Sequence, residues 1–473
     1  MISQTGATNS HGDWYAPWVR AAIGPAWARW EHSAYLSNYR RLLATQYDAP
    51  EAIRARQWEA VQGLVDHAFR RSPFWRTLFG EAGLKPDDVR TWDDFRHVPI
   101  LTKDHLRYRG QELLTTDFRI ADLHHHKTSG SNGRSVAVYV DDKAQQWRRA
   151  CTLRSDEWSG WRFGERVAMV WGNPDYLRNG WRGRLRNTLL ERASYLDTLS
   201  MNEDAMRRFA LTQQRRRPTM MLGHAHSLYL FAQFVELNPK LAFYPRGIIS
   251  TAMVLHDWQR ELIERVFRAG VTNRYGCEEV SLIACQCDRR GGLHINCDNV
   301  YVEILGADGE PATPGEAGAV VVTDLTNRAM PLLRYKVGDM ASLSREACAC
   351  GRQLPLLERV EGREADFVTT ADGRLISGIS LTENFAVLIA GVAQIQIVQE
   401  RLDQFCFRIV PDENFGAASR EQIRQLVAER FGGDARFEIE LVERIPQEPS
   451  GKYRFCISKV ENPFTQSLQP VTS

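Results

Sequence analysis

Net charge, long apolar runs and lysine are all scarce in this 473-residue sequence. The formal net charge is only +2, so no global electrostatic case exists for nucleic acid or an anionic membrane as a partner. No apolar run reaches transmembrane length, and the first residues lack the basic and apolar regions of a secretion signal. We therefore expect a cytoplasmic protein without a membrane-spanning segment, either a monomer or a homodimer.

Cysteine is present in an odd number, nine, which does not suit a fully paired disulfide framework. In a reducing compartment, closely spaced cysteines point to metal binding or catalysis instead. The composition, 43% hydrophobic and 25% charged, is that of a globular protein, and the length predicts two or more domains.

The apolar pattern predicts an α/β fold. Short strands at residues 166–171, 220–222 and 247–250 alternate with helices at 140–158 and 258–269, as in largely parallel sheets. Residues 300–305 and 318–323 predict hairpin strands. After residue 362 the rhythm changes to strand, strand, helix and strand. This predicts a large domain over residues 1–362, with a helical extension at 1–50, and a small α+β domain over 363–473.

The helical extension is rich in tryptophan. Trp14, Trp18, Trp27 and Trp30 are candidates for a membrane-surface face, but we favour packing of these side chains against the large domain.

One stretch rich in glycine and hydroxyl groups precedes a predicted strand at residues 136–140. Such a turn can aim backbone N–H groups at an anion, and Gly130 and Gly133 permit the required backbone conformations. It is not a Walker sequence, and on composition alone an ordinary hairpin turn is favoured. The candidate phosphate-binding residues are Thr128, Ser129, Gly130, Ser131 and Gly133.

Three later motifs carry further candidates. Tyr275 and Gly276 offer a flat face on which a base can stack, and Glu279 is a candidate Mg²⁺ ligand. Asp339 follows a glycine turn and suits the hydroxyls of a ribose. Lys452, beside a glycine, suits a mobile cation that reaches into another domain. Read singly, each motif has an ordinary alternative: a Tyr-Gly turn, a hairpin aspartate or a solvated lysine.

In chain order, the motifs T-S-G-S-N-G, Y-G-x-x-E, R-Y-K-x-G-D, E-G-R and S-G-K resemble the adenylate-forming enzymes. The resemblance is strongest to the phenylacetate–CoA ligase group and its CapK-like branch, and it runs from about residue 55 to 460. Residues 99–103, 323–331 and 350–352 add to it.

The resemblance implies a large ATP- and acyl-binding domain with mixed sheets and flanking helices, plus a small mobile domain. It implies an enzyme that activates a carboxylic acid with ATP and Mg²⁺, releasing pyrophosphate and leaving an acyl-adenylate. Thr128 and its neighbours would hold the triphosphate, Glu279 the Mg²⁺, Tyr275 the adenine, and Asp339 with Arg363 the ribose. Lys452 would bridge the carboxylate and the α-phosphate.

The resemblance also implies a pocket for the acid. It places Gly223, His224 and His226 at the acyl group and predicts an aromatic or planar acid. Ser250, Thr251 and Ala252 lie beside this pocket and are candidates for binding the nucleotide. The alternative is that both histidines only cap the following helix.

Two short clusters suggest a zinc site. Cys287 and His294 flank a turn, and Cys348 and Cys350 form the second pair, which together meet the need of tetrahedral zinc for four ligands. The resemblance selects Cys287 rather than Cys285 as the ligand. Unpaired thiols in a reducing cytosol are the alternative. The adjacent His124, His125 and His126 lie on an extended segment and cannot readily chelate one ion together.

Transfer of the acyl group is less well specified than its activation. Ala365 stands where the resembled ligases usually carry the first of two acids, so the acceptor is CoA, an amine or a hydroxyl group. A full acyl-CoA synthetase and an inactive nucleotide-binding scaffold are the two alternatives that we carry forward.

Overall fold

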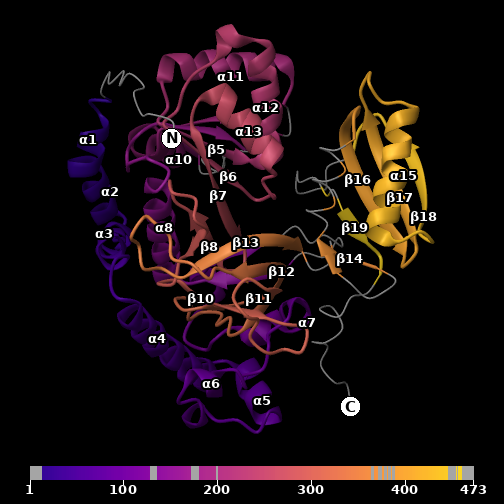
Figure 1. Ribbon diagram of the computed structural model, residues 1–473. Coiled ribbons are helices and arrows are strands. Elements are labelled where there is room, and N and C mark those ends of the chain that lie inside the picture. The colour runs from indigo at the N-terminus through magenta and orange to yellow at the C-terminus, as the bar shows by residue number, and fades with distance from the viewer. Residues whose placement is uncertain are drawn as a thin grey trace.

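The structure is a computed structural model that describes most of the chain. The described residues are 13–127, 136–171, 180–198, 201–363, 367–370, 375–377, 381, 385, 389–445, 454 and 456–460. Within them, strands and helices alternate, and a large mixed sheet is accompanied by a smaller four-stranded sheet (Figure 1). The expected α/β class with mixed sheets and flanking helices is confirmed.

The helices that precede the first strand include the tryptophan-rich extension. They are α1 (Ala16–Trp18), η1 (Val19–Ile23), α2 (Gly24–Trp30), α3 (Tyr35–Thr45), α4 (Pro50–Arg71), α5 (Pro73–Glu81), η2 (Pro86–Asp88), α6 (Trp92–Phe95), α7 (Lys103–Leu113) and η3 (Ile120–Asp122). The later helices are α8 (Asp142–Glu157), α10 (Gly180–Arg186), η4 (Asn187–Glu191), α11 (Glu203–Arg216), α12 (Ala225–Leu237), η6 (Pro239–Leu241), α13 (Asp257–Phe267) and α15 (Ala417–Phe431).

The large sheet joins eleven described strands. In spatial order they are β10 (Val300–Leu305), β11 (Ala317–Asp324), β12 (Tyr335–Leu343), β13 (Leu356–Arg363), β9 (Leu293–Ile295), β8 (Ser281–Gln286), β7 (Gly270–Cys277), β6 (Gly247–Thr251), β5 (Met220–His224), β3 (Val167–Val170) and β4 (Ala193–Leu196). The strands from β4 to β7 pair in parallel, and the strands from β7 to β10 pair antiparallel.

The parallel strands are apolar on both faces because helices cover both. Met221 and Ile248 point into a cluster with α11, α12 and α13. Met220, Leu222 and Ile249 point the other way, into a cluster with α8 and the N-terminal helices. Continuous apolar runs are the usual pattern of parallel strands buried on both sides, which is why these segments were recognisable in the sequence.

The remaining described strands form three smaller sheets. β1 (His124–Lys127) pairs antiparallel with β2 (Ala137–Val140), and β14 (Phe367–Thr369) pairs with β15 (Leu375–Ser377). The four-stranded sheet has the order β18 (Arg436–Leu441), β17 (Gln404–Pro411), β16 (Val392–Arg401) and β19 (Cys456–Ser458). Its buried side chains and those of α15 form a cluster with no described member before Val368. The domain boundary at residues 362 and 363 stays a prediction.

Local features of the sequence account for several of these elements. Thr102 is the N-cap of α7, and its hydroxyl accepts a hydrogen bond from the His105 N–H. The hairpin of β10 and β11 forms as expected. The preference for tryptophan packing is wrong for three of the four side chains, since Trp14, Trp18 and Trp30 are exposed.

Candidate active site and metal centre

The carboxyl ends of the parallel strands bring several predicted residues to one edge of the large sheet. Ser250 on β6 pairs with Gly223 on β5, and Thr251 pairs with His224. A side chain at Gly223 would place a Cβ 2.7 Å from the Val170 carbonyl oxygen, so only glycine fits there. Ligands of open α/β sheets bind beyond these strand ends. Ala252, next along, has a left-handed φ of 65°, which turns the chain away from the sheet.

Two tyrosines and two acids form a reciprocal arrangement. The Tyr275 hydroxyl on β7 donates to Oδ2 of Asp339 on β12 at 2.8 Å. The Tyr335 hydroxyl on β12 donates to Oε1 of Glu279, just beyond β7, at 3.0 Å. Each motif thus supplies one tyrosine to the acid of the other. Burial and the neighbouring carboxylates raise the pKa of both tyrosines well above the ordinary value, so both hydroxyls stay protonated as donors.

Glu279 is held from three directions. Its side chain is almost fully buried, and Lys103 Nζ, at the start of α7, lies 3.6 Å from Oε1. Its backbone carbonyl accepts a 2.8 Å hydrogen bond from the buried guanidinium of Arg148, which also binds Asp324. A fixed, buried carboxylate beside an exposed lysine suits a divalent cation and the phosphates that accompany it. The sequence reading missed Lys103, Arg148 and Tyr335 as neighbours of Glu279.

Asp339 does not follow a simple turn as the sequence suggested, because it lies within β12. Between the pairs Val321–Lys336 and Ala319–Met340, four residue steps on β12 oppose two on β11, so the strand bulges. Gly338, with φ of 90°, allows this bulge. Arg363 is the backbone register partner of Asp339 on β13, as the proposed ribose site requires, although its side chain lies outside the described part.

The predicted pocket histidines are buried near the same sheet edge. The His224 ring packs against Trp171 with ring centroids 4.1 Å apart. His224 stands at the N-cap of α12 but its side chain makes no capping hydrogen bond there, which removes the capping alternative for this residue. His226, within the first turn of α12, lies 3.4 Å from the Gln259 amide. Trp171 carried no signal in the sequence because its contact is non-local.

The three adjacent histidines lie on β1 and do not converge. His124 contacts Asp142, and His126 Nδ1 lies 3.8 Å from Glu278. His125 stacks on Tyr139. Their different partners agree with the prediction that they do not chelate one ion together.

Several predicted site residues lie outside the described part of the chain. They are the glycine-rich stretch of Thr128, Ser129, Gly130, Ser131 and Gly133, together with Lys452. Their roles stay predictions.

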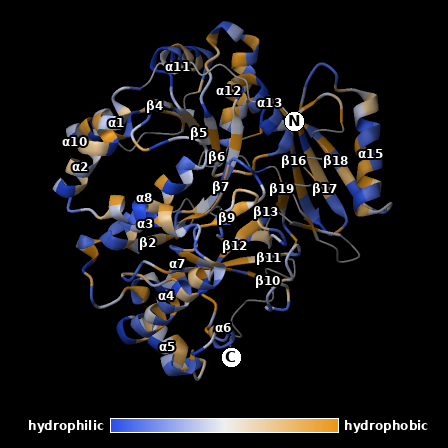
Figure 2. Cartoon of the chain, turned by 60° about the vertical axis from the view of Figure 1, so that its left-hand side comes forward, coloured by the Kyte–Doolittle hydropathy of each residue, from blue (hydrophilic) through white to orange (hydrophobic). Residues whose placement is uncertain are grey.

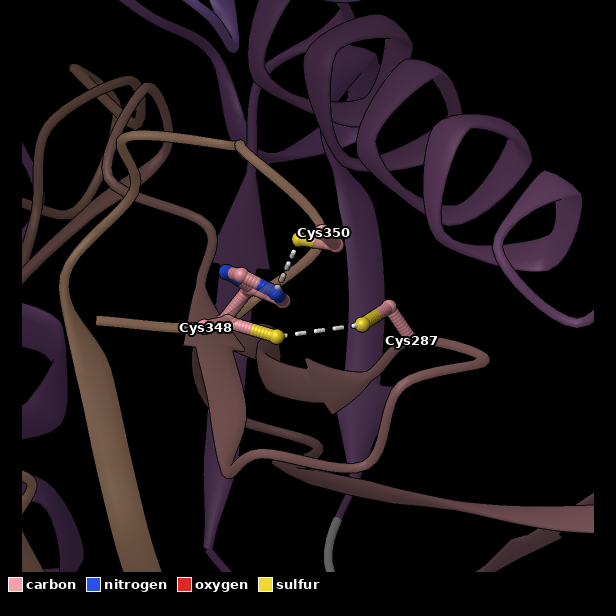
Figure 3. Close-up of side chains that lie close together, drawn as sticks. Cys287, Cys348 and Cys350 are labelled. Atoms are coloured by element: carbon pink, nitrogen blue, oxygen red, sulfur yellow. Dashed lines mark hydrogen bonds between the residues drawn. The ribbon is translucent and has the colours of Figure 1, made fainter. Parts of the chain in front are cut away.

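The four predicted metal ligands come together (Figure 3). The ligand atoms of Cys287, His294, Cys348 and Cys350 all lie within 4.8 Å of one another. Cys287 Sγ is 3.6 Å from Cys348 Sγ, and Cys350 Sγ is 3.2 Å from His294 Nε2. Soft thiolates and an imidazole at such distances form a donor set that suits a tetrahedral metal ion.

The backbone explains why these side chains converge. β8 ends one residue before Cys287, a turn follows, and β9 returns with His294. A Cβ at Gly291 would lie 3.2 Å from Cys348 Sγ, so this turn packs closely on the second pair. Burial, with Arg352 nearby, lowers the pKa of His294 to about 4, which keeps the imidazole neutral as a ligand must be. Cys285 is not in the cluster and lies beside Arg274 instead.

The sequence of this chain is similar to a known domain family and to several characterised proteins. Residues 368–459 match the CapK C-terminal domain family. Protein CapK of Staphylococcus aureus is 24% identical over 403 residues, which cover 83% of this chain and 86% of CapK. The phenylacetate-coenzyme A ligase of Thermus thermophilus is 29% identical over 386 residues, covering 77% of this chain and 83% of the ligase.

This chain is a homologue of CapK and of the phenylacetate-coenzyme A ligases. Solved structures agree on the fold. A 2-hydroxyisobutyryl-CoA ligase in the postadenylation state, with 2-HIB-AMP bound, superposes with a TM-score of 0.67 at 22% identity, covering 85% of this chain and 89% of that one. The amide bond synthetase McbA of Marinactinospora thermotolerans gives 0.52 at 17% identity, covering 70% and 68%. The fold of this CapK homologue is therefore that of the adenylate-forming enzymes.

Proposed function

We propose that the chain is a ligase that uses ATP to activate a carboxylic acid as an acyl-adenylate and then transfers the acyl group to an acceptor. The homology to phenylacetate-coenzyme A ligases supports this class of reaction. The observation that carries the proposal is the reciprocal pairing of Tyr275 with Asp339 and of Tyr335 with Glu279. It fixes the buried Glu279 and the half-buried Asp339 at the sheet edge where a nucleotide of this fold would lie.

In this proposal, one oxygen of the substrate carboxylate attacks the α-phosphorus of ATP, and the bond to the leaving pyrophosphate breaks. Asp339, whose Oδ2 accepts the hydrogen bond from Tyr275, would bind the ribose. Glu279 offers a buried carboxylate to Mg²⁺, which when bound neutralises charge on the phosphate oxygens. Lys452 would place a cation between two anionic reactants, and Thr128 to Gly133 would hold the triphosphate.

The acid would sit near Trp171 and His224, whose rings contact each other at a tilt of 43° beside Gly223 and Ser250. An imidazole can stack on an aromatic ring and also donate a hydrogen bond. We therefore propose an aromatic or otherwise planar acid that carries a polar group. His226 would line the deeper end of this pocket.

The Cys287, His294, Cys348 and Cys350 cluster would hold one zinc ion. Four protein ligands leave no open position for water, so the ion would stabilise the fold rather than take part in the reaction. The segment that follows Cys350 is linked to the N-terminal helices, because the Arg352 guanidinium donates a hydrogen bond to the Gln46 side chain at 3.0 Å.

The acceptor remains CoA, an amine or a hydroxyl group. Ala365 replaces an acid of the resembled CoA ligases, and the relatives by fold include both a CoA ligase and an amide bond synthetase. A full acyl-CoA synthetase is therefore the second candidate. We propose a cytoplasmic location, in keeping with nine cysteines of which none forms a disulfide.

The deciding experiment incubates the protein with ATP, Mg²⁺ and a panel of carboxylic acids and measures pyrophosphate. Acid-dependent release is expected, and its absence across aromatic and aliphatic acids would favour an inactive scaffold. Repeating the assay with CoA, amines and alcohols identifies the acceptor. A thioester formed as fast as the adenylate would establish the CoA synthetase.

A further inference from the structure

The solvent-exposed side of the N-terminal helices is unusually apolar for the surface of a protein. In α1, η1 and α2, the inward side is formed by small and apolar residues such as Ala16, Val19 and Ala28. The residues of the outward side between positions 14 and 30 are Trp14, Pro17, Trp18, Ala21, Ala22, Ala26, Arg29 and Trp30. A helix on a protein surface ordinarily turns polar and charged residues outward. The outward side of α1, η1 and α2 instead carries apolar residues and one arginine, and it has no acidic residue.

A second helix extends the same surface. α10 lies beside α2 (Figure 2), and its exposed residues include Trp181, Arg182, Arg184 and Leu185. The exposed fractions of Trp14, Trp18, Trp30 and Trp181 are 75%, 61%, 57% and 68%. Four indoles this open are rarely tolerated without a partner. We call the surface formed by Trp14 and exposed residues of α1, η1, α2 and α10 the tryptophan–arginine face. Its residues are Trp14, Pro17, Trp18, Ala21, Ala22, Ala26, Arg29, Trp30, Trp181, Arg182, Arg184 and Leu185.

The charges of the tryptophan–arginine face are one-sided. The acids of these segments are all ion-paired with arginine: Asp13 pairs with Arg192, and Glu31 and Glu191 share Arg186. Arg29, Arg182 and Arg184 make no ion pair within the described part of the chain. The cations left over are therefore arginines, whose planar guanidinium binds phosphate in a bidentate manner.

A pocket opens in the middle of the tryptophan–arginine face. It has a volume of about 500 Å³ and is lined by Trp27, Trp30, Glu31, Arg182, Gly183 and Arg186. Trp27 and Trp30 meet edge to face with centroids 5.0 Å apart. Of the two arginines in the lining, Arg186 is paired with Glu31, and Arg182 makes no ion pair within the described residues. An indole pair together with an unpaired guanidinium suits a group that is apolar at one end and anionic at the other.

We propose that the tryptophan–arginine face docks the protein on the surface of a bilayer that contains anionic phospholipid. Indole rings favour the region between headgroups and acyl chains, where one edge is apolar and the N–H is wet, and arginines bind the headgroup phosphates. Among the described helices none is long and apolar enough to cross a bilayer. The attachment is therefore peripheral, and the net charge of only +2 makes it depend on this patch rather than on the whole molecule.

The test is co-sedimentation of the full chain with vesicles of phosphatidylcholine alone or with one quarter phosphatidylglycerol. Binding to the anionic vesicles is expected to be at least tenfold stronger and to fall with salt. Trp18→Ser with Trp30→Ser, and separately Arg182→Glu with Arg184→Glu, are each expected to reduce it at least tenfold. Matched controls are Leu237→Ser on α12 and Arg208→Glu on α11, which lie at exposed positions elsewhere and are expected to bind normally.

Circular dichroism and the melting temperature establish that each variant is folded. In a second measurement, vesicles with brominated acyl chains should quench tryptophan fluorescence only in the unaltered chain and the controls. Equal binding to neutral and anionic vesicles, or binding unchanged in both variants, overturns the proposal. A dimer in lipid-free sedimentation that Trp18→Ser with Trp30→Ser dissociates also overturns it, since the face then joins two copies. None of these readouts depends on the proposed ligase activity.

Discussion

The hydroxyl of Tyr275 donates a 2.8 Å hydrogen bond to the carboxylate of Asp339, although the two residues stand on strands that are not neighbours in the sheet. The bond from Tyr335 to Glu279 repeats the relationship in the opposite direction. Each tyrosine precedes its own motif's acid by four residues and binds the other motif's acid. The proposed adenine, ribose and Mg²⁺ contacts therefore share one hydrogen-bonded frame.

Removing the Tyr275 hydroxyl should weaken ATP binding. A hydrogen bond to a charged group contributes about 1.5–3 kcal/mol, so Tyr275→Phe should raise the KM for ATP roughly tenfold or more while kcat changes less. The matched control is Tyr39→Phe, which removes a tyrosine–carboxylate bond to Glu157 at the remote α3–α8 contact. Steady-state kinetics in which both variants show the same KM for ATP would contradict the role given to Tyr275.

Replacing Lys452 should abolish adenylation without abolishing ATP binding. Lys452→Ala is expected to slow acid-dependent pyrophosphate release by two or more orders of magnitude, because the cation acts where the two anions meet. Lys459→Ala is the control, since Lys459 pairs with Glu400 on the small sheet. Near-normal pyrophosphate release from the Lys452 variant would show that another group does this work.

The cysteine–histidine cluster predicts about one zinc ion per chain. Cys350→Ser should lose most of the metal and lower the melting temperature, and a strong chelator should lower it likewise in the parent protein. Cys406→Ser, which alters a buried thiol of the small sheet, should keep its zinc. Metal analysis of freshly purified, chelator-free protein is the measurement, and an absence of zinc there would refute the site.

The contact between His224 and Trp171 predicts a change of substrate preference on mutation. His224→Ala should shift the ratio of activity toward aromatic and aliphatic acids, because one of the two contacting rings is lost. His97→Ala, at an exposed position after α6, should leave the ratio unchanged. Substrate profiles of the two variants that match the parent would remove His224 from the acyl pocket.

The buried His226 predicts a loss of stability toward acid. Burial, with His256 nearby, lowers its pKa from the ordinary 6.5 to about 4, so the folded protein keeps it neutral. Below pH 6.5 the unfolded chain binds the extra proton, and the free energy of unfolding falls with pH by up to about 3 kcal/mol at pH 4. Well above pH 6.5, where the histidine is neutral in both states, it adds no pH dependence.

Urea unfolding at pH 7 and pH 5 measures this effect. The drop in unfolding free energy between the two pH values should be about 2 kcal/mol smaller in His226→Gln than in the parent. His97→Gln, at an exposed site, should behave as the parent does. A drop of equal size in His226→Gln and the parent would mean that His226 is protonated in the folded state.

Much of the site was predictable because its signals are local. The strands at 220–224 and 247–251 were predictable from continuous apolar runs. The ligands Cys287, His294, Cys348 and Cys350 were recognisable because each pair sits on one short turn. The order of the five motifs along the chain was enough to indicate the adenylate-forming fold.

What the sequence could not determine depends on contacts between distant segments. The apposition of Lys103 with Glu279, and of Tyr275 with Asp339, follows from how α7, β7 and β12 meet in space, for which periodicity carries no information. The bulge that places Asp339 inside a strand depends on its pairing with β11.

The N-terminal helices are the sharpest case. Alanine and tryptophan occur all round α1, η1 and α2, so composition alone does not say which side faces the sheet. Packing determines which side of these helices faces inward. At Gly24, for example, a Cβ would come within 2.6 Å of the Phe163 ring, so only a glycine fits at that contact. The tryptophans were thereby turned outward, to the surface that we propose meets the membrane.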